Sequence, residues 1–441
     1  MLAMLLQLTA ALWASVACAV IAYYGCRCNG GGAKRDDDDD QKTTRAAGPP
    51  GSARRLVFAA LPAIFLLAAS PTLFVDRERA AVLVTPVLGQ LSLTTFKLLA
   101  FAAGRGPLAR PALPPLEFIV WAVCPVLPPT HVENAAAAAK KGGGGDATAA
   151  PAGPPTAAEA RALLLAAVPQ ALSAAFAGAV AGSADALGIP RPVKYWFYTL
   201  LLSQTVTCVW QLWRAGVASG FGLPPSARFP RLRTGAQFDA PWLSDGFAEY
   251  WGRRWNATTA RALRALAYDP IVEGRLVAAA AKASEATETE TNGKNQAEAE
   301  PPGGAATPAV AVVAQRPRAP ARPGAGASPL RRFLALQATF ALSGAWHALV
   351  IYAPNTGTWR GAWRWFLFFA MQGPVVAAEV AVVRLWTARW SLRLPPRPLR
   401  VLLTNALLIA AATPLFFGPC DTTGMCARMF DSTRRMVGLR A

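Results

Sequence analysis

Long apolar runs separated by polar stretches dominate this chain. One of these runs, LEFIVWAVCPVLP (116–128), is shorter than the other eight and is expected to be re-entrant or partly buried. A helix needs about 20 apolar residues to cross the hydrocarbon core of a bilayer. The pattern therefore predicts an all-α, multi-pass transmembrane helical bundle with eight or nine spans. The eight longer runs cover residues 2–24, 56–75, 81–103, 162–187, 193–213, 333–353, 363–385 and 399–417.

The polar stretches between these runs divide the chain into parts. Runs of Ala, Gly, Pro, Thr and Glu bury too little apolar surface to offset the entropy of folding, so they are expected to be disordered. The predicted parts are N-terminal membrane spans over 1–132, with a disordered Asp-rich loop at 26–52; a low-complexity loop at 133–160; membrane spans and an aromatic polar segment over 161–277; a disordered linker at 278–329; and C-terminal membrane spans over 330–441.

Composition and charge agree with a membrane protein. Hydrophobic residues make up 53% of the chain and charged residues 16%, against about 25% in an average soluble protein. The net charge is +19, and the bases lie mainly between the apolar runs, as in 45–55 and 316–332. Bases there are typical of loops that face anionic lipid, which argues against a nucleic-acid partner. A contribution to binding an anionic substrate, such as a CoA phosphate, stays open.

One polar segment, residues 228–270, keeps its aromatic residues and has no low-complexity run. Ser244 or Asp245 is expected to cap a helix here, with Glu249 near its positive end. An aromatic face opposite an arginine face is typical of an amphipathic helix in the membrane interface, and a plain surface anchor explains it equally well. The aromatic face holds Phe247, Trp251, Trp255, Ala262 and Leu266; the opposite face holds Arg253, Arg254, Arg261 and Arg264, with Asn256 at the border.

The run FALSGAWHALVIYAP (340–354) carries His347, one of two histidines in the chain. His347 lies about 22 Å along a helix from Arg332, too deep for its side chain to reach the interface. An ionisable side chain within a span indicates a functional site or a water-filled cavity; a histidine hydrogen-bonded across a helix interface is the alternative. Ser343 and Gly344, one turn earlier, leave room for a neighbouring helix or a substrate. No metal is expected, because no second ligand accompanies the histidine.

A buried neutral imidazole can accept the proton of a hydroxyl group and make its oxygen a better nucleophile. The GxSxG pattern of a serine nucleophile is absent. Direct transfer to a hydroxyl substrate therefore fits better than a covalent intermediate.

Several motifs resemble the plant (jojoba-type) wax synthases of the membrane-bound O-acyltransferase superfamily. The resemblance implies an enzyme of the endoplasmic reticulum membrane that esterifies an acyl group from acyl-CoA, its co-substrate, onto a long-chain alcohol, with no bound cofactor. It implies that His347 is the catalytic histidine and Asn256 its polar partner. The motifs are QFDAPWLSDGFAEYWGRRWN (237–256), YDP (268–270), FKLLAFAAGRGPL (96–108), FALSGAWHALV (340–350) and MQGPVVAAEVAV (371–382).

Roles for the neighbouring residues follow from this combined interpretation. Arg253 and Arg254 suit contact with CoA phosphates. Asn256 either orients the alcohol or donates to the developing oxyanion. Trp346 stands where a smaller residue is expected and bears on the choice of acceptor. The other residues predicted to line the substrate site are Trp251, Trp255, Ser343 and Gly344.

Three competing interpretations remain at this stage. The acceptor could be a sterol, diacylglycerol or a specialised alcohol. A transporter or lipid-binding protein with His347 in a proton relay predicts further intramembrane acids, and Glu379 and Asp185 are the available ones. Asn256-Ala-Thr258 is a glycosylation sequon; a glycan there would place the segment in the lumen and exclude a CoA-facing site.

Overall fold

A computed structural model describes residues 2–27, 52–73, 81–109, 113–126, 128, 154–224, 229–278, 326–389 and 394–428. All regular secondary structure within these ranges is helical, as predicted. The predicted loops 26–52 and 133–160 and the linker 278–329 lie almost entirely outside the described residues. Their ends are described, and there α7 begins at Ala157 and α13 at Pro329, inside the predicted loop and linker.

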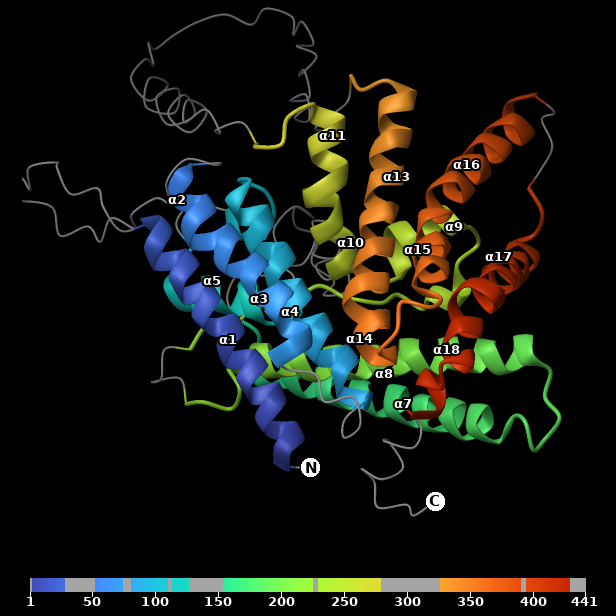
Figure 1. Ribbon diagram of the computed structural model, residues 1–441, viewed down its shortest axis with the longest axis horizontal. Coiled ribbons are helices and arrows are strands. Elements are labelled where there is room, and N and C mark those ends of the chain that lie inside the picture. The colour runs from blue at the N-terminus through green and yellow to red at the C-terminus, as the bar shows by residue number, and fades with distance from the viewer. Residues whose placement is uncertain are drawn as a thin grey trace, which may run out of the picture.

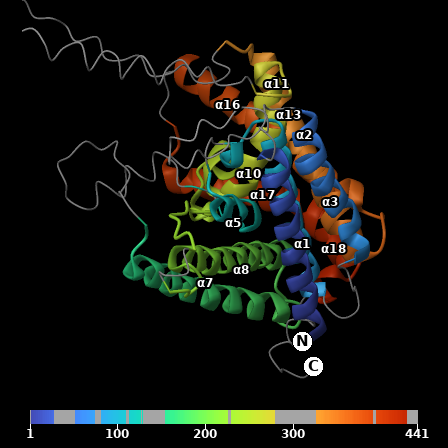
Figure 2. The ribbon, with the colours of Figure 1, turned by 90° about the vertical axis from the view of Figure 1, so that its left-hand side faces the viewer.

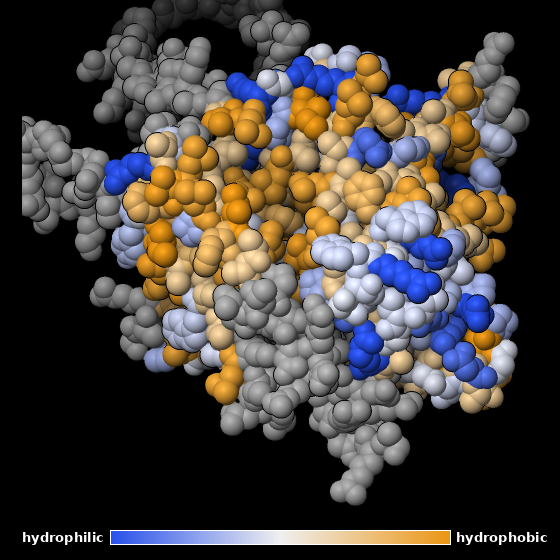
Figure 3. Space-filling model, viewed as in Figure 1, coloured by the Kyte–Doolittle hydropathy of each residue, from blue (hydrophilic) through white to orange (hydrophobic). Residues whose placement is uncertain are grey.

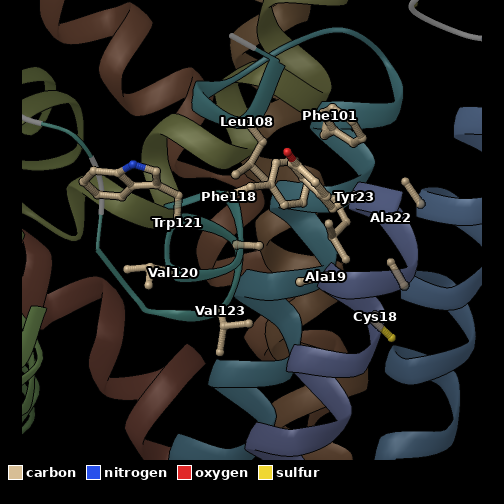
Figure 4. Packing of buried hydrophobic residues seen from close by; sticks show 14 of the residues in the cluster. Cys18, Ala19, Ala22, Tyr23, Phe101, Leu108, Phe118, Val120, Trp121 and Val123 are labelled. Carbon is tan, nitrogen blue, oxygen red and sulfur yellow. The ribbon is translucent and has the colours of Figure 1, made fainter. Parts of the chain in front are cut away.

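The N-terminal helices form one packed group. Alanines on α1 that are fully buried allow α3, α4 and α5 to approach closely. Figure 4 shows Tyr23 of α1 beside Phe118 of α5, with ring centroids 5.3 Å apart. The elements are α1 (Leu2–Arg27), α2 (Ala53–Arg55), η1 (Leu56–Ala60), α3 (Leu61–Leu73), α4 (Ala81–Ala102), η2 (Pro107–Ala109) and α5 (Pro115–Val123).

Two long helices, α7 (Ala157–Ser183) and α8 (Arg191–Ser219), form an antiparallel pair. Thr156 and Glu159 make a reciprocal capping box that starts α7, and Gly220, with φ +65°, ends α8 in the left-handed conformation. Figures 1 and 2 show the pair running across the direction of α1 and α13 rather than along it. The apolar pattern of residues 162–187 predicts the helix but not this orientation.

The C-terminal helices surround α13. Figure 1 shows α13 between α10 and α11 on one side and α15 and α16 on the other. The elements are η4 (Pro241–Leu243), α9 (Phe247–Glu249), η5 (Tyr250–Arg254), α10 (Ala257–Leu263), η6 (Arg264–Tyr268), α11 (Asp269–Glu273), α13 (Pro329–Trp346), η7 (His347–Tyr352), α14 (Ala353–Thr356), α15 (Ala362–Ala370), α16 (Gln372–Arg389), α17 (Arg397–Ala412), η8 (Thr413–Phe417) and α18 (Gly418–Thr422).

Five helical segments in the described part of the chain are long and apolar enough to cross a membrane. The protein is therefore a membrane protein, while the count of eight or nine spans stays a prediction. Helix α8 falls outside the five because polar side chains such as Gln204 and Arg214 interrupt it. Figure 3 shows broad apolar surface over α3 and α13 and a polar patch near α18. The segments are Thr9–Cys26, Ala157–Ser183, Pro329–Thr356, Ala362–Ala388 and Arg397–Thr422.

Candidate active site

His347 stands where the helix of the histidine-bearing span changes its hydrogen-bond pattern. Helix α13 ends at Trp346, and a π-helical turn begins at His347. Such turns are frequent at functional sites. The half-buried imidazole places Nδ1 2.8 Å from the backbone carbonyl oxygen of Ser343. A carbonyl only accepts hydrogen bonds, so Nδ1 carries the proton and the lone pair of a neutral ring lies on Nε2.

Aromatic rings enclose this imidazole. Phe369 of α15 stacks on it with centroids 3.7 Å apart, and Trp346 lies edge-on at 4.4 Å. The indole N–H of Trp346 donates to the hydroxyl of Ser92 on α4 at 2.7 Å, which fixes the ring. The imidazole therefore lies among aromatic rings of α13 and α15.

Gly344 serves helix packing. A Cβ atom at this position would lie 2.6 Å from the backbone carbonyl oxygen of Phe366, so α15 fills the space beside it. The sequence left open whether a helix or a substrate occupies that space. The structure answers that it is a helix. Ser343 contacts His347 Nδ1 through its carbonyl oxygen at 2.8 Å and through its hydroxyl at 3.4 Å.

The WGRRWN segment is not the continuous amphipathic helix that its periodicity predicts. Trp255 is extended, and Asn256 adopts the left-handed conformation with φ +44°. Asparagine tolerates this conformation better than most residues. The Asn256 side chain then accepts the backbone N–H of Thr259 at 3.1 Å and caps the new helix α10. The arginines on either side of the break therefore do not share one face.

Gln237 fixes Asn256 in place. Its amide group donates to Asn256 Oδ1 and accepts the backbone N–H of Thr258 at 3.0 Å. Because the Asn256 oxygen already accepts two hydrogen bonds, its NH₂ group is the part left for a ligand. The hydrogen-bonding capacity that Asn256 retains is therefore that of a donor. Thr258 is 1% exposed with its hydroxyl bonded to Gln237, a geometry that does not present the sequon for glycosylation.

Phe369 joins the two predicted halves of the site. The Phe369 ring contacts Trp251 edge-on, with centroids 6.2 Å apart, and stacks on His347. The Trp251 indole donates to Gln372 at 3.0 Å, and Gln372 is 1% exposed. Trp255 stacks on Tyr250 at 5.5 Å and lies further from the histidine, beside an open recess.

The two predicted phosphate-binding arginines differ in exposure and in hydrogen-bond partners. The Arg254 side chain is 8% exposed, with Nε 3.0 Å from Glu249 Oε1 and Nη1 donating to the backbone carbonyl of Asp239 at 2.6 Å. The Arg253 side chain is 62% exposed and pairs with Glu249 one turn earlier. Arg253 is therefore accessible to a phosphate, whereas Arg254 holds the segment together.

This difference predicts two distinct outcomes. Arg253→Ala should raise the KM for acyl-CoA by about two- to fivefold, the size of an exposed charge contact, and leave unfolding unchanged. Arg254→Ala should lower the free energy of unfolding by about 2 kcal/mol, because it leaves the Glu249 carboxylate without its buried partner. Steady-state kinetics and thermal unfolding of both variants measure this. Equal effects of the two variants on both quantities would contradict it.

Glu249 makes the segment sensitive to acid. Burial by itself raises the pKa of the Glu249 carboxyl, but hydrogen bonds from the Asp245 backbone and Arg254 outweigh it and lower the pKa from 4.5 to about 2. The unfolded chain therefore binds this proton more readily. The stabilisation is fully present above pH 4.5 and lost as pH falls toward 2. Thermal unfolding of the wild type and Glu249→Gln over this range should show the variant losing less stability on acidification.

Glu379 of α16 caps the segment from outside. Its two carboxylate oxygens accept the backbone N–H groups of Phe247 at 2.9 Å and Ala248 at 2.8 Å. The cap predicted at Ser244 or Asp245 is not formed by either side chain. The Ser244 hydroxyl donates to the carbonyl of Pro241, and the Asp245 carboxylate pairs with Arg400. The signal in the sequence was an acid within an apolar run. Bonded to two backbone groups, it is poorly suited to the proton relay of a transporter.

The basic residues of the FKLL motif hold elements together. Lys97 is 3% exposed and donates to the carbonyl oxygens of Trp121, Cys124 and Val126 at the end of α5, the first at 2.8 Å. Cations at a helix C-terminus are stabilising. Arg105, nine residues from the start of the motif, makes a two-pronged contact with Glu273 of α11 at 2.9 and 3.1 Å. The two basic residues of this motif therefore hold α4 and its following turn against α5 and α11.

The sequence was compared with protein families and with curated proteins. No protein-family model matches the chain. A curated plant protein, the "Probable long-chain-alcohol O-fatty-acyltransferase 9" of Arabidopsis thaliana, is 27% identical to it over 201 residues. The match covers 45% of this chain and 43% of the relative, so the chain spans less than half of the relative's length. The chain is similar to an alcohol acyltransferase. Within the described residues, no group of three or more His, Cys, Asp or Glu side chains could hold a metal ion.

Proposed function

We propose that this protein is an acyl-CoA-dependent O-acyltransferase that forms wax esters from a fatty acyl group and a long-chain alcohol. His347 is its general base, and the endoplasmic reticulum membrane its location. The observation that carries the proposal is the hydrogen bond from His347 Nδ1 to the Ser343 carbonyl, which leaves Nε2 free to accept a proton among aromatic rings. The similarity to a long-chain-alcohol acyltransferase supports this acceptor over a sterol or diacylglycerol.

The proposed reaction proceeds in one transfer step. His347 Nε2 takes the proton of the alcohol hydroxyl as its oxygen attacks the thioester carbonyl carbon of acyl-CoA. The Asn256 NH₂ group donates to the oxygen that becomes negative. The carbon–sulfur bond then breaks, and the CoA sulfur leaves with the proton from the imidazolium. The Ser343 carbonyl stabilises the imidazolium between these two proton transfers, because it accepts its Nδ1–H bond.

Location within a bilayer suits this chemistry. The alcohol and acyl chain are both apolar and reach His347 without entering water. The CoA moiety is anionic, and the exposed Arg253 provides a cation for it on the WGRRWN segment.

An acceptor panel tests the proposal. The full chain in microsomes receives radiolabelled palmitoyl-CoA with 1-hexadecanol, cholesterol or diacylglycerol, and products are separated by thin-layer chromatography. The expected result is a labelled ester with hexadecanol that greatly exceeds the other two. Labelled ester with cholesterol or diacylglycerol alone would reject the wax synthase activity, and no ester with any acceptor would reject acyl transfer.

A further inference from the structure

A recess away from His347 lies between α8, η4, η5 and α17. It is a small recess that opens at the surface, where Trp196 is 37% exposed. Most of its wall is aromatic or aliphatic, as in sites for apolar ligands. The lining residues that matter below are Trp196, Thr199, Ser203, Tyr250, Asn405 and Ile409.

Three side chains in the wall of this recess, those of Asn405, Ser203 and Thr199, present hydrogen-bond acceptors to it. The amide NH₂ of Asn405 donates to the carbonyl oxygens of Trp242 at 3.0 Å and Val401 at 2.8 Å. Both its hydrogens are thereby used, and its oxygen remains able to accept. The hydroxyls of Ser203 and Thr199 donate to carbonyl groups of their own helix, each at 3.0 Å, and keep only their lone pairs for a ligand.

Tyr250 adds a hydroxyl group to this wall, beside the indole rings of Trp196, Trp242 and Trp255. The residue is 5% exposed and lines the recess, and its hydroxyl makes no hydrogen bond with the described part of the chain. The side chain is therefore largely buried, while its hydroxyl has no partner among the described residues and stays available to a ligand or to water. It can donate one hydrogen bond and accept others.

These hydrogen-bonding groups favour one kind of ligand head group over others. A ligand hydroxyl can donate to the Asn405 oxygen and accept from the Tyr250 hydroxyl, so it satisfies both. A thioester, ester or ether oxygen only accepts, and it leaves Asn405 unsatisfied. A carboxylate would enter with a charge that no lysine or arginine in the lining neutralises.

We propose that the recess is a second lipid site, which binds a single-chain lipid by its hydroxyl head group. The hydroxyl lies between Asn405 and Tyr250, and the chain lies against Trp196 and Ile409. The site is separate from the reacting position, because the rings of Trp251 and Phe369 stand between Tyr250 and His347. It goes beyond the proposed function, since binding here requires neither acyl-CoA nor turnover.

Photo-crosslinking tests this site without any measurement of activity. The purified full chain in detergent is irradiated with a 1-hexadecanol analogue that carries a mid-chain diazirine, and adducts are located by mass spectrometry. We expect adducts on α8 and α17 at the recess, suppressed by 1-hexadecanol but not by its methyl ether or by palmitate. Adducts confined to other surfaces, or equal suppression by all three competitors, would overturn the proposal.

Three variants sharpen the result. Ile409→Trp fills the recess and should abolish the adducts there, whereas Leu407→Trp, on the 57% exposed side of the same helix, should leave them unchanged. Tyr250→Phe removes only the hydroxyl and should reduce labelling about tenfold, the equivalent of one buried hydrogen bond. Unchanged labelling of Tyr250→Phe would overturn the hydroxyl assignment even if Ile409→Trp does not fold. If the wild-type protein is labelled at the recess but forms no ester, that result contradicts only the proposed reaction.

Discussion

Replacement of His347 by alanine is expected to abolish ester formation, with kcat reduced by about 100- to 10,000-fold, the usual contribution of a general base. The imidazole bonds to the backbone of its own helix and stacks on Phe369. Its loss therefore removes the proton acceptor without breaking a bond between helices. The measurement is the initial rate of hexadecyl palmitate synthesis in microsomes, normalised to protein in the membrane.

His131→Ala is the matched control, because His131 is the one other histidine in the chain and lies outside the described residues. We expect it to retain the wild-type rate. If His347→Ala keeps more than about a tenth of the wild-type rate at equal protein, the general-base role is refuted.

Replacement of Glu379 by alanine is expected to be the most damaging change outside the histidine span. It leaves the backbone N–H groups of Phe247 and Ala248 without their charged acceptor, at a cost of about 2–4 kcal/mol for two such bonds. Because these groups begin the WGRRWN segment, the segment should detach from α16. We therefore expect a lower unfolding temperature in detergent and a higher KM for acyl-CoA.

Two further variants separate this cap from a general defect in α16. The backbone at Gly246 is extended, with φ −178°, and accepts alanine. The Cβ atom added by Gly246→Ala would, however, overlap the Glu379 carboxylate. It should therefore reproduce the loss with Glu379 present. Val382→Ala, at a position 55% exposed on the same helix, is the control and should behave as wild type. A Glu379→Ala protein with unchanged unfolding and KM would reject the capping role.

Part of the site follows from sequence patterns alone. Apolar runs predict the helices, and the position of His347 deep within one run marks it as a candidate site residue. Both predictions need only the order of apolar and polar residues along the chain. The assignment of Arg253, Arg254, Arg261 and Arg264 to one helical face, with Asn256 at its border, was wrong in geometry. It assumed a regular helix, and a single left-handed residue at Asn256 breaks it. The catalytic and binding roles of Asn256, Arg253 and Arg254 stay predictions.

Contacts between distant segments could not be read from the sequence. Phe369 touches both Trp251 and His347, and no periodicity links positions so far apart. The acid at position 379 is visible in the sequence, but its partners at 247 and 248 are backbone groups with no side-chain signature.

The sequence by itself determined that the chain is helical and built for lipid, and that one histidine lies deep in an apolar helix. Apolar surface must leave water, and a helix satisfies its own backbone inside a membrane, so composition and period suffice for both. Tertiary structure alone decided the direction of α7 and α8, the helix beside Gly344, the external cap by Glu379 and the recess at Tyr250. Each depends on which side chains meet after packing, and packing selects among many arrangements that the same hydrophobic pattern allows.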